Sequence, residues 1–319
     1  MYNYKEHLIS ENALIKEALV VLDKLAINAI LFVIDNEGKL VGSLTDGDVR
    51  RGLIKGLGTE DVVKLFIQKE PKFIKKDNYN IDDIIALREK NFKILPVVDG
   101  NHRIINVLNF RKQKSYLPVD AVIMAGGLGS RLRPLTEKVP KPLLMVGDKT
   151  IIDHNVDRLR KFGIDDYWIS VRYLGEQLEA HYGNGEDRNV NIKYLWEDEP
   201  LGTIGAVSNV KDFQNEYVLV TNSDILTNLD YEDFFLDFIE KDADMSVVTI
   251  PYSVDIPYAV MDTEDNRVLS FKEKPTYTYY SNGGIYLMKK SVLKYLPVET
   301  FYNATDLMEK LIEEGKKIV

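Results

Sequence analysis

The chain contains no cysteine among its 319 residues. Disulfide bonds, thiolate chemistry and zinc sites built on cysteine sulfur are therefore excluded, which suits a reducing compartment. The sequence also lacks an uncharged apolar run of the roughly 18 residues that a membrane helix needs. Its first residues show no signal-peptide pattern. We therefore expect a cytoplasmic protein that does not bind membranes.

Acidic residues outnumber basic ones. Lys and Arg total 41 against 50 Asp and Glu, which gives a formal net charge of −9 and disfavours binding to nucleic acid. A site for phosphate groups in such a protein must concentrate positive charge locally or use a metal ion. The hydrophobic content of 45% and the charged content of 29% are typical of a soluble globular protein. A chain of 319 residues is long enough for two domains with separate cores.

An internal repeat occupies the first 115 residues. Residues 31–44 align without gaps with residues 95–108, and each copy reads as a strand, a polar turn and a second strand. An amphipathic helix pattern precedes each copy, at about 12–25 and 81–90. Two such units packed face to face would share one core.

The repeat resembles a tandem pair of CBS domains, a regulatory module of the Bateman type. In that family a Thr and an Asp at the spacing of Thr45 and Asp48 hold the ribose and phosphate of an adenosine nucleotide. The second copy has Asn109 and Lys112 at the matching positions, so the resemblance implies at most one adenosine site. Two alternatives stay open: Thr45 and Asp48 equally suit a cap for the following helix, and the pair could serve only for assembly.

The pattern changes after a polar, proline-containing linker at residues 113–119. Apolar strand patterns lie near residues 121–125, 167–172, 191–195, 217–221 and 245–250. Helix patterns alternate with them near residues 151–162, 175–182, 203–210 and 231–241. This alternation predicts an α/β fold with a doubly wound, mainly parallel sheet covered by helices on both faces. We expect domains at residues 1–115 and 116–319, with ligands beyond the carboxyl ends of the strands.

The most informative segment is residues 121–136, where a short apolar strand pattern runs into a glycine-rich turn. Gly126, Gly127 and Gly129 leave backbone N–H groups accessible, as in loops that bind phosphate. Ser130 and Arg131 follow at once, and Lys141 comes shortly after. The spacing fits neither the P-loop nor the dinucleotide fingerprint. The segment predicts a loop that binds nucleotide phosphates, with an ordinary tight turn as the alternative.

Other candidate residues follow predicted strands and turns. Asp224 comes directly after a strand pattern, where an acidic residue is well placed for Mg²⁺. A lone carboxylate binds this ion weakly, so Asp306 is the candidate second ligand. Gly202 would let the backbone approach a flat ring, at a helix that begins near Thr203. Each feature also has a plain structural interpretation, as a helix cap or a helix start.

Two further motifs lie near the end of the chain. Glu273 and Lys274 place a cation beside a carboxylate, and such a pair is often only a solvated surface charge. Asn282 and Gly283 read as a turn into a strand. The amide of Asn282 could bond sugar hydroxyls, although turn formation alone would explain it.

In this order the motifs resemble the sugar-1-phosphate nucleotidyltransferase family, over almost all of residues 120–319. The resemblance implies that a magnesium-dependent enzyme joins a nucleoside monophosphate from a nucleoside triphosphate to a sugar 1-phosphate and releases pyrophosphate. The fusion to CBS domains is similar to a bacterial subgroup linked to guanylyl transfer for surface glycans, which favours GMP. A non-catalytic sensor of nucleotides or nucleotide sugars is the alternative. We also expect a homo-oligomer.

The same resemblance implies roles for the candidate residues. The triphosphate would be held by Gly126, Gly127, Gly129, Ser130 and Arg131, and the reacting phosphates would meet Lys141. The magnesium ion would bind Asp224 and Asp306. The sugar phosphate would bind Lys274, the sugar hydroxyls Glu273 and Asn282 beside Gly283, and the base would lie against Gly202.

Overall fold

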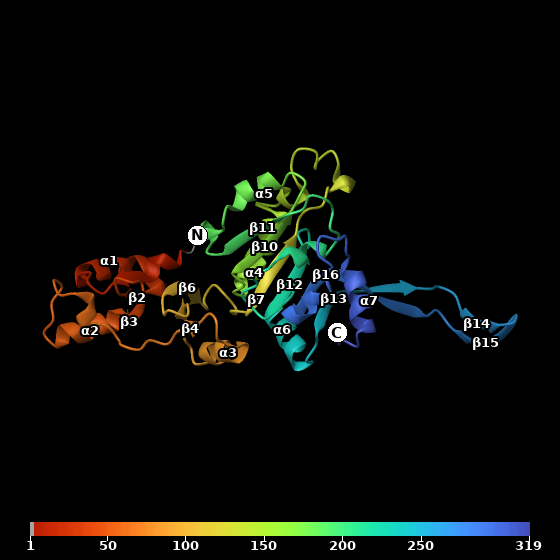
Figure 1. Cartoon of the computed structure of the whole chain (residues 1–319). Helices are drawn as coiled ribbons and strands as arrows, with labels where there is room; N and C mark the ends of the chain where they lie inside the picture. Colours follow the sequence, from red (N-terminus) through yellow and green to blue (C-terminus); the bar gives the residue numbers. More distant parts are fainter. Residues whose placement is uncertain (1–2) are drawn as a thin grey trace.

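The computed structural model describes residues 3–319, in which an N-terminal module lies beside a larger α/β domain (Figure 1). The module occupies the red-to-orange part of the chain, and a long β-ribbon projects from the opposite side of the larger domain. None of the helices in residues 3–319 combines the length and apolar character that crossing a bilayer requires.

The module consists of two three-stranded sheets with the same topology. In each sheet the first strand is parallel to the second, and the second is antiparallel to the third. The first sheet contains β1 (Leu8–Ser10), β2 (Leu31–Ile34) and β3 (Leu40–Leu44). The second contains β4 (Ile74–Lys75), β5 (Ile94–Val98) and β6 (Ile104–Asn109). The internal repeat of the sequence is therefore a structural repeat.

Three helices cover these sheets, α1 (Ile15–Leu25), α2 (Asp46–Ile54) and α3 (Ile81–Glu89). The apolar face of α1 is buried because Ile15, Ala18 and Leu22 recur at helical spacing. Phe32 of the first sheet and Val98 of the second belong to one buried cluster. The two copies therefore share a core, as the repeat predicts.

The larger domain is built on a six-stranded sheet with the order β11-β10-β7-β12-β16-β13. Its first four strands are parallel, and β16 is antiparallel to both its neighbours. The strands are β7 (Val119–Met124), β10 (Asp166–Val171), β11 (Asn191–Trp196), β12 (Tyr217–Asn222), β13 (Met245–Asp255) and β16 (Thr276–Lys289). The helices are α4 (Ile151–Lys161), α5 (Gly175–Tyr182), α6 (Tyr231–Glu240) and α7 (Ala304–Glu313).

Both faces of this sheet are buried, so β7 reads as an apolar run from Ala121 to Met124. Ala121 and Ile123 pack in the cluster that contains the apolar faces of α4 and α6. Val122 points to the other cluster, with Leu307 and Leu311 of α7. The α/β fold with a doubly wound, mainly parallel sheet is therefore confirmed.

One local expectation is wrong. The helix expected at residues 203–210 is a short 3₁₀ turn (Gly205–Asn209), because the N–H groups of Ile204 and Gly205 both donate to the Tyr302 carbonyl at 3.2 Å. These N–H groups are therefore not available to a ligand. Within the expected linker at residues 113–119, Tyr116 and Leu117 are buried.

Shorter elements complete the chain. A hairpin is formed by β8 (Met145–Val146) and β9 (Lys149–Thr150). Further 3₁₀ turns are Tyr4–His7, Ala26–Asn28, Val63–Leu65, Ser130–Leu132, Lys141–Leu143, Glu186–Arg188 and Lys290–Tyr295.

A β-ribbon extends from the edge of the large sheet. The strands β13 and β16 stay paired beyond the sheet, and β14 (Val260–Glu264) pairs with β15 (Arg267–Lys272) at the tip. We call residues 250–281 the arm. Figure 1 shows the arm projecting from the body of the protein in blue. The sequence predicts a strand only at its start and a turn near its end.

The module and the larger domain are joined over a buried seam. Ile84 and Leu95 of the module lie in the same apolar cluster as Ala121 of the central strand β7. Arg88 makes a two-pronged ion pair with the buried Glu232, with both N–O distances at 2.9 Å. The second copy of the repeat is therefore packed against the α/β domain as part of one core.

Candidate active site

The glycine-rich loop lies at the carboxyl end of β7, as expected. Gly129 has a φ of +60°, and a Cβ there would lie 2.9 Å from Cγ2 of Thr136. A Cβ on Gly126 would lie 2.9 Å from Oε1 of Glu197, whereas one on Gly127 would meet nothing within 4 Å. Glycine is therefore required at residues 126 and 129 by close packing, and residue 127 leaves its backbone open to a ligand.

This loop forms one wall of a cavity of about 410 Å³. The cavity lies over the carboxyl ends of β7 and β12, where α/β sheets bind ligands. Eight of the residues singled out in the sequence line it together: Gly126, Gly127, Gly129, Ser130, Arg131, Lys141, Gly202 and Asp224. Segments distant in the sequence are thus brought to one place.

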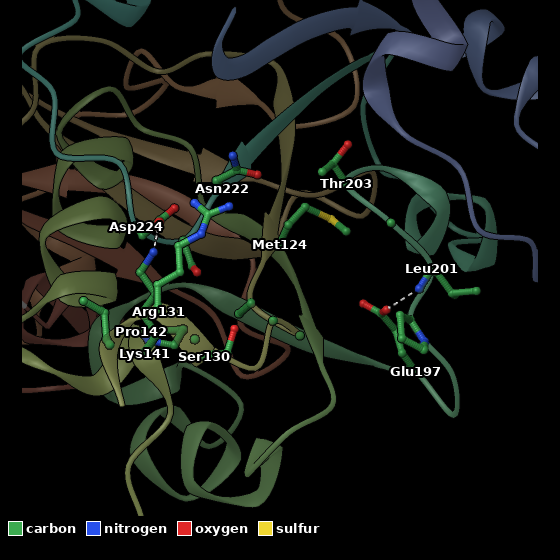
Figure 2. Close-up of a pocket in the computed structure, with 18 of the residues that line it drawn as sticks. Met124, Ser130, Arg131, Lys141, Pro142, Glu197, Leu201, Thr203, Asn222 and Asp224 are labelled. Atoms are coloured by element: carbon green, nitrogen blue, oxygen red, sulfur yellow. Dashed lines mark hydrogen bonds and ion pairs between the residues drawn. The ribbon is translucent and has the colours of Figure 1, made fainter. Parts of the chain in front are cut away.

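Arg131, Lys141 and Asp224 lie together on one side of the cavity (Figure 2). Figure 2 shows Arg131 beside Lys141, and the Lys141 ammonium forms an ion pair with the Asp224 carboxylate. Two short 3₁₀ turns carry the cations, one after the glycine loop and one at Lys141–Leu143. The loop between them is held by the Thr136 hydroxyl, which donates to the Gly129 carbonyl at 2.9 Å. The two cations and one carboxylate suit a polyphosphate with a divalent ion.

The opposite side of the cavity presents Glu197, a residue to which sequence reasoning gave no role (Figure 2). Its buried carboxylate accepts hydrogen bonds from the Ser170 hydroxyl and from the Leu201 N–H, the latter at 2.9 Å. Within residues 3–319 it has no ion-pair partner. Its position directly after the last residue of β11 is the signal that could have identified it.

Gly202 lines the cavity on the same side as Glu197. Its φ is +78°, and a Cβ there would lie 2.5 Å from the Tyr302 carbonyl oxygen. Tyr302 in turn donates its N–H to the Leu201 carbonyl at 3.1 Å. Glycine is therefore needed where this loop passes the Tyr302 backbone.

The remaining predicted substrate residues do not line this cavity. Glu273 and Lys274 lie in the arm, just after β15. The Asn282 side chain is used locally, since its Oδ1 accepts from the Gly284 N–H at 2.9 Å and from the Tyr286 hydroxyl at 3.0 Å. A Cβ on Gly283 would lie 2.7 Å from the Val248 carbonyl oxygen. Their sugar-binding roles stay predictions.

Asp306 lies at the start of α7, outside the residues that line the cavity. Its Oδ2 accepts from the Asn303 N–H at 2.8 Å, so it caps the helix. Residues 3–319 contain no group of three or more His, Cys, Asp or Glu arranged to hold a metal. Mg²⁺ usually binds one or two carboxylates together with substrate phosphates and water. Asp224, whose side chain is about one-third exposed beside the glycine-rich loop, fits that pattern, and the metal role of Asp306 stays a prediction.

The predicted adenosine residues also form a helix cap. The Asp48 carboxylate accepts from the Thr45 N–H at 2.8 Å and from the Thr45 hydroxyl at 2.6 Å, and it pairs with Arg51. These bonds explain why both residues stand at the start of α2. The nucleotide-binding role stays a prediction.

Comparisons with known proteins agree with this geometry. A family model described as nucleotidyl transferase matches residues 120–319, and one described as CBS domain matches residues 5–55. A D-glycero-alpha-D-manno-heptose 1-phosphate guanylyltransferase from Aneurinibacillus thermoaerophilus is 33% identical over 60% of this chain and 84% of the relative. The mannose-1-phosphate guanylyltransferase of Mycobacterium tuberculosis is 33% identical over 56% of this chain, but only 51% of that relative.

A solved structure shows the same likeness. It is a Bacillus anthracis protein provisionally assigned as a glucose-1-phosphate thymidylyltransferase and crystallised with sucrose. The two proteins are 26% identical with a TM-score of 0.50, over 63% of this chain and 86% of the other.

Proposed function

Because the chain belongs to the nucleotidyl transferase family, we propose that it transfers a guanylyl group from GTP to a sugar 1-phosphate. Pyrophosphate is the second product, and the nucleotide sugar serves as a precursor for surface glycans. One observation carries the proposal: the glycine loop, Arg131, Lys141 and Asp224 line a single cavity. Residues 116–319 form the catalytic domain in this proposal, and residues 1–115 form the regulatory module.

The class of acceptor substrate that we propose rests on the names of the relatives. The heptose and mannose guanylyltransferases and the assigned glucose thymidylyltransferase act, by their names, on different sugars and bases. A sugar 1-phosphate is common to all three names. A sugar 1-phosphate is therefore the acceptor class that we propose for this chain.

The choice of guanine as the base of the nucleotide substrate rests on Glu197. A carboxylate accepts hydrogen bonds and donates none, and each of its oxygens can accept a second bond beyond those from Ser170 and Leu201. Guanine presents two adjacent donors, its ring N1–H and its exocyclic amine, whereas uracil and thymine present one donor between two acceptors. Glu197 at the cavity wall therefore favours guanine.

The reaction needs alignment and charge neutralisation more than covalent chemistry. The sugar phosphate oxygen attacks the α-phosphorus of GTP in line, the bond to the β,γ-pyrophosphate breaks, and no enzyme intermediate forms. The open backbone at Gly127 and the guanidinium of Arg131 hold the triphosphate, and Lys141 approaches the reacting phosphates. Asp224 would hold Mg²⁺, which neutralises charge that builds on the leaving pyrophosphate.

The Lys141–Asp224 ion pair is rearranged in this proposal. When the triphosphate enters, Lys141 turns to the phosphate oxygens and Asp224 is released for the divalent ion. Both side chains are about one-third exposed, at 33% and 35%, so neither is locked in the protein interior.

A regulatory site in the N-terminal module accompanies this activity. The match to the CBS domain model spans both Thr45 and Asp48. An adenosine nucleotide bound there would replace the cap contacts of these two residues. We propose that such a nucleotide regulates the enzyme.

A release assay tests the proposal. Pyrophosphate is measured for each of GTP, ATP, UTP, CTP and dTTP against a panel of sugar 1-phosphates with Mg²⁺. Turnover with GTP and one class of sugar 1-phosphate is expected. Absence of pyrophosphate with every pair, together with calorimetric binding of a nucleotide sugar, would instead establish the non-catalytic sensor.

A further inference from the structure

One side of α4 is bonded to both of the segments that carry Lys141 and Asp224. The residues that make these contacts are three or four positions apart along the helix, so they lie near one another on its surface. They are Ile151, His154, Asn155 and Arg158. Their hydrogen bonds lead in two directions, toward the chain that follows Lys141 and toward the loop that follows β12. A single rigid element therefore holds both segments.

The first two of these residues hold the chain that follows Lys141. The Ile151 N–H donates to the Leu144 carbonyl at 3.0 Å, and Nε2 of His154 donates to the Val146 carbonyl at 2.9 Å. Leu144 comes directly after the 3₁₀ turn Lys141–Leu143. The position of this turn is therefore fixed relative to α4.

Asn155 holds the backbone directly before Asp224. Its side chain is 5% exposed, and its Nδ2 amide donates to the Ser223 carbonyl at 2.9 Å and to the Ile151 carbonyl at 3.1 Å. The Ser223 N–H in turn donates to the Met124 carbonyl at 3.1 Å, at the end of β7. Ser223 is thus bonded at both its N–H and its carbonyl, so the Asp224 side chain starts from a fixed backbone.

Arg158 holds the other end of the same loop. Its Nη2 donates to the Asn228 carbonyl at 2.6 Å, and its Nε donates to the Leu229 carbonyl at 3.2 Å. The loop between β12 and α6 is therefore bonded to α4 both before and after Asp224. These two attachments come from side chains about one helical turn apart.

The surroundings of Asn155 favour an apolar residue at this position. Ile152, Val156 and Leu159 of the same helix are buried and apolar. Asn has a lower helix propensity than Leu, and a buried amide is costly unless it is hydrogen-bonded. One of the two bonds made by the Asn155 amide leads to the residue before Asp224. This bond accounts for an amide among apolar neighbours.

We propose that Asn155 and Arg158 are positioning residues that fix the Asp224 carboxylate relative to Lys141 during the reaction. The inference rests on the proposed function, in which a triphosphate and a divalent ion replace the Lys141–Asp224 ion pair (Figure 2). Side chains that orient metal ligands without touching the metal commonly change metal affinity or activity by about 10–100-fold. A misplacement of about 1 Å at reacting groups can cost a similar factor.

Binding of a GTP analogue tests the proposal without turnover. The probe is α,β-methylene GTP, whose bridge between the α and β phosphorus atoms cannot be broken. Calorimetry gives its Kd with Mg²⁺ and with EDTA, and the ratio of the two values measures how far the metal tightens binding. This ratio depends on the position of Asp224, whereas a general loss of structure would weaken binding under both conditions.

Two variants remove the attachments of the loop. Asn155→Leu keeps the approximate volume of the side chain and removes the donor to Ser223, while Arg158→Met removes the donors to residues 228–229. Each is expected to lower the Mg²⁺ effect on the Kd by about 10-fold, with a nearly unchanged Kd in EDTA. Arg158→Lys keeps one donor and should restore most of the Mg²⁺ effect. Arg158 is only partly buried, so its variants stay informative even where Asn155→Leu fails to fold.

The matched control is Val156→Ala, one position after Asn155, whose side chain packs in the apolar core. This variant should lower the melting temperature and leave the Mg²⁺ effect as in the wild type. An equal loss of the Mg²⁺ effect in Val156→Ala, or a wild-type Mg²⁺ effect in both Asn155→Leu and Arg158→Met, would overturn this inference alone. Failure of the wild-type chain to bind the analogue would instead refute the proposed function and the inference with it.

Discussion

The Lys141 ammonium and the Asp224 carboxylate form an ion pair on one side of the cavity, although 83 positions separate them in the chain. A partly exposed pair of this kind contributes only about 0–1 kcal/mol to stability. Its position beside the glycine loop matters more than its energy, because each partner can exchange the other for a phosphate or a cation. Substitutions in this pair therefore allow effects on catalysis to be separated from effects on stability.

Replacing Asp224 by Asn keeps the size of the side chain and removes its charge. We expect pyrophosphate release to fall by about 10²–10³-fold or more, because a group that stabilises transition-state charge is lost. The melting temperature should hardly change. The matched control is Asp237→Asn, which breaks a surface ion pair with Lys241 at 2.8 Å and should leave turnover intact. Near-normal turnover in Asp224→Asn would rule out its role with the metal.

Arg131 and Arg133 offer a matched pair of substitutions two positions apart. Arg131 lines the cavity and Arg133 does not. We expect Arg131→Ala to raise the KM for the triphosphate by about 10-fold or more, with a smaller effect on the sugar phosphate. Arg133→Ala should leave both values near wild type. Equal effects of Arg131→Ala on the two substrates would contradict its assignment to the triphosphate.

Glu197→Gln tests the choice of base. The amide keeps an acceptor but adds a donor, which suits uracil or thymine better than a carboxylate does. We expect the ratio of kcat/KM for GTP over UTP to fall by about 10–100-fold, as one mismatched base contact costs roughly 1–3 kcal/mol. A ratio unchanged from wild type would remove Glu197 from base recognition.

Asp120 gives the protein a pH-dependent stability. It is fully buried on β7, opposite Asp166, and burial raises the pKa of Asp120 to about 7. Between about pH 4 and pH 7 the unfolded chain loses this proton while the folded chain keeps it, so stability falls by up to about 1.4 kcal/mol per pH unit. Below pH 4 both states are protonated, and the full contribution is present.

The variant Asp120→Asn should remove this pH slope. It keeps an oxygen for the Asn215 N–H, which donates to Asp120 at 2.7 Å. Urea unfolding at several pH values between 4 and 8 should show that the free energy of unfolding of the variant rises relative to that of the wild type as the pH increases. The exposed Asp187→Asn serves as the control, and parallel curves for Asp120→Asn and wild type would contradict the buried-carboxyl explanation.

The regulatory site can be tested by calorimetry with AMP and ATP. Heat of binding at millimolar nucleotide is expected for the wild type. The variant Thr45→Val, which replaces the hydroxyl by a methyl group, should weaken binding about 5-fold, as loss of one hydrogen bond costs on the order of 1 kcal/mol. Absence of heat with both nucleotides would leave the module as an assembly surface.

Much of the fold can be predicted from the sequence because its signals are local. The apolar run at Ala121–Ile123 and the glycines that follow predict both the central strand and the loop above it. The repeat at residues 31–44 and 95–108 likewise predicts two matching hairpins. Each of these features is encoded within about 15 neighbouring residues.

Features that depend on distant partners escape such reasoning. The Glu197 carboxylate is held in position by a hydrogen bond from Ser170. Ser170 lies in β10, which pairs with β11 only in the folded protein. The expected helix after Thr203 is replaced by a turn because Tyr302, about a hundred residues later in the chain, takes its N–H groups. Polar and apolar residues alternate in the arm as they do in strands. The polar turns between them, however, do not indicate the length of the ribbon.

The seam between the two halves of the polypeptide has a practical consequence. A gene truncated to start at residue 116 would strip Ile84 and Leu95 from the interior they share with β7, and would leave the acidic Glu232 without Arg88. Such a fragment is expected to precipitate when expressed. It exposes apolar surface to water and leaves a buried carboxylate without its ion-pair partner. The module therefore contributes to the folding of the α/β domain, and the two parts need to be produced as one chain.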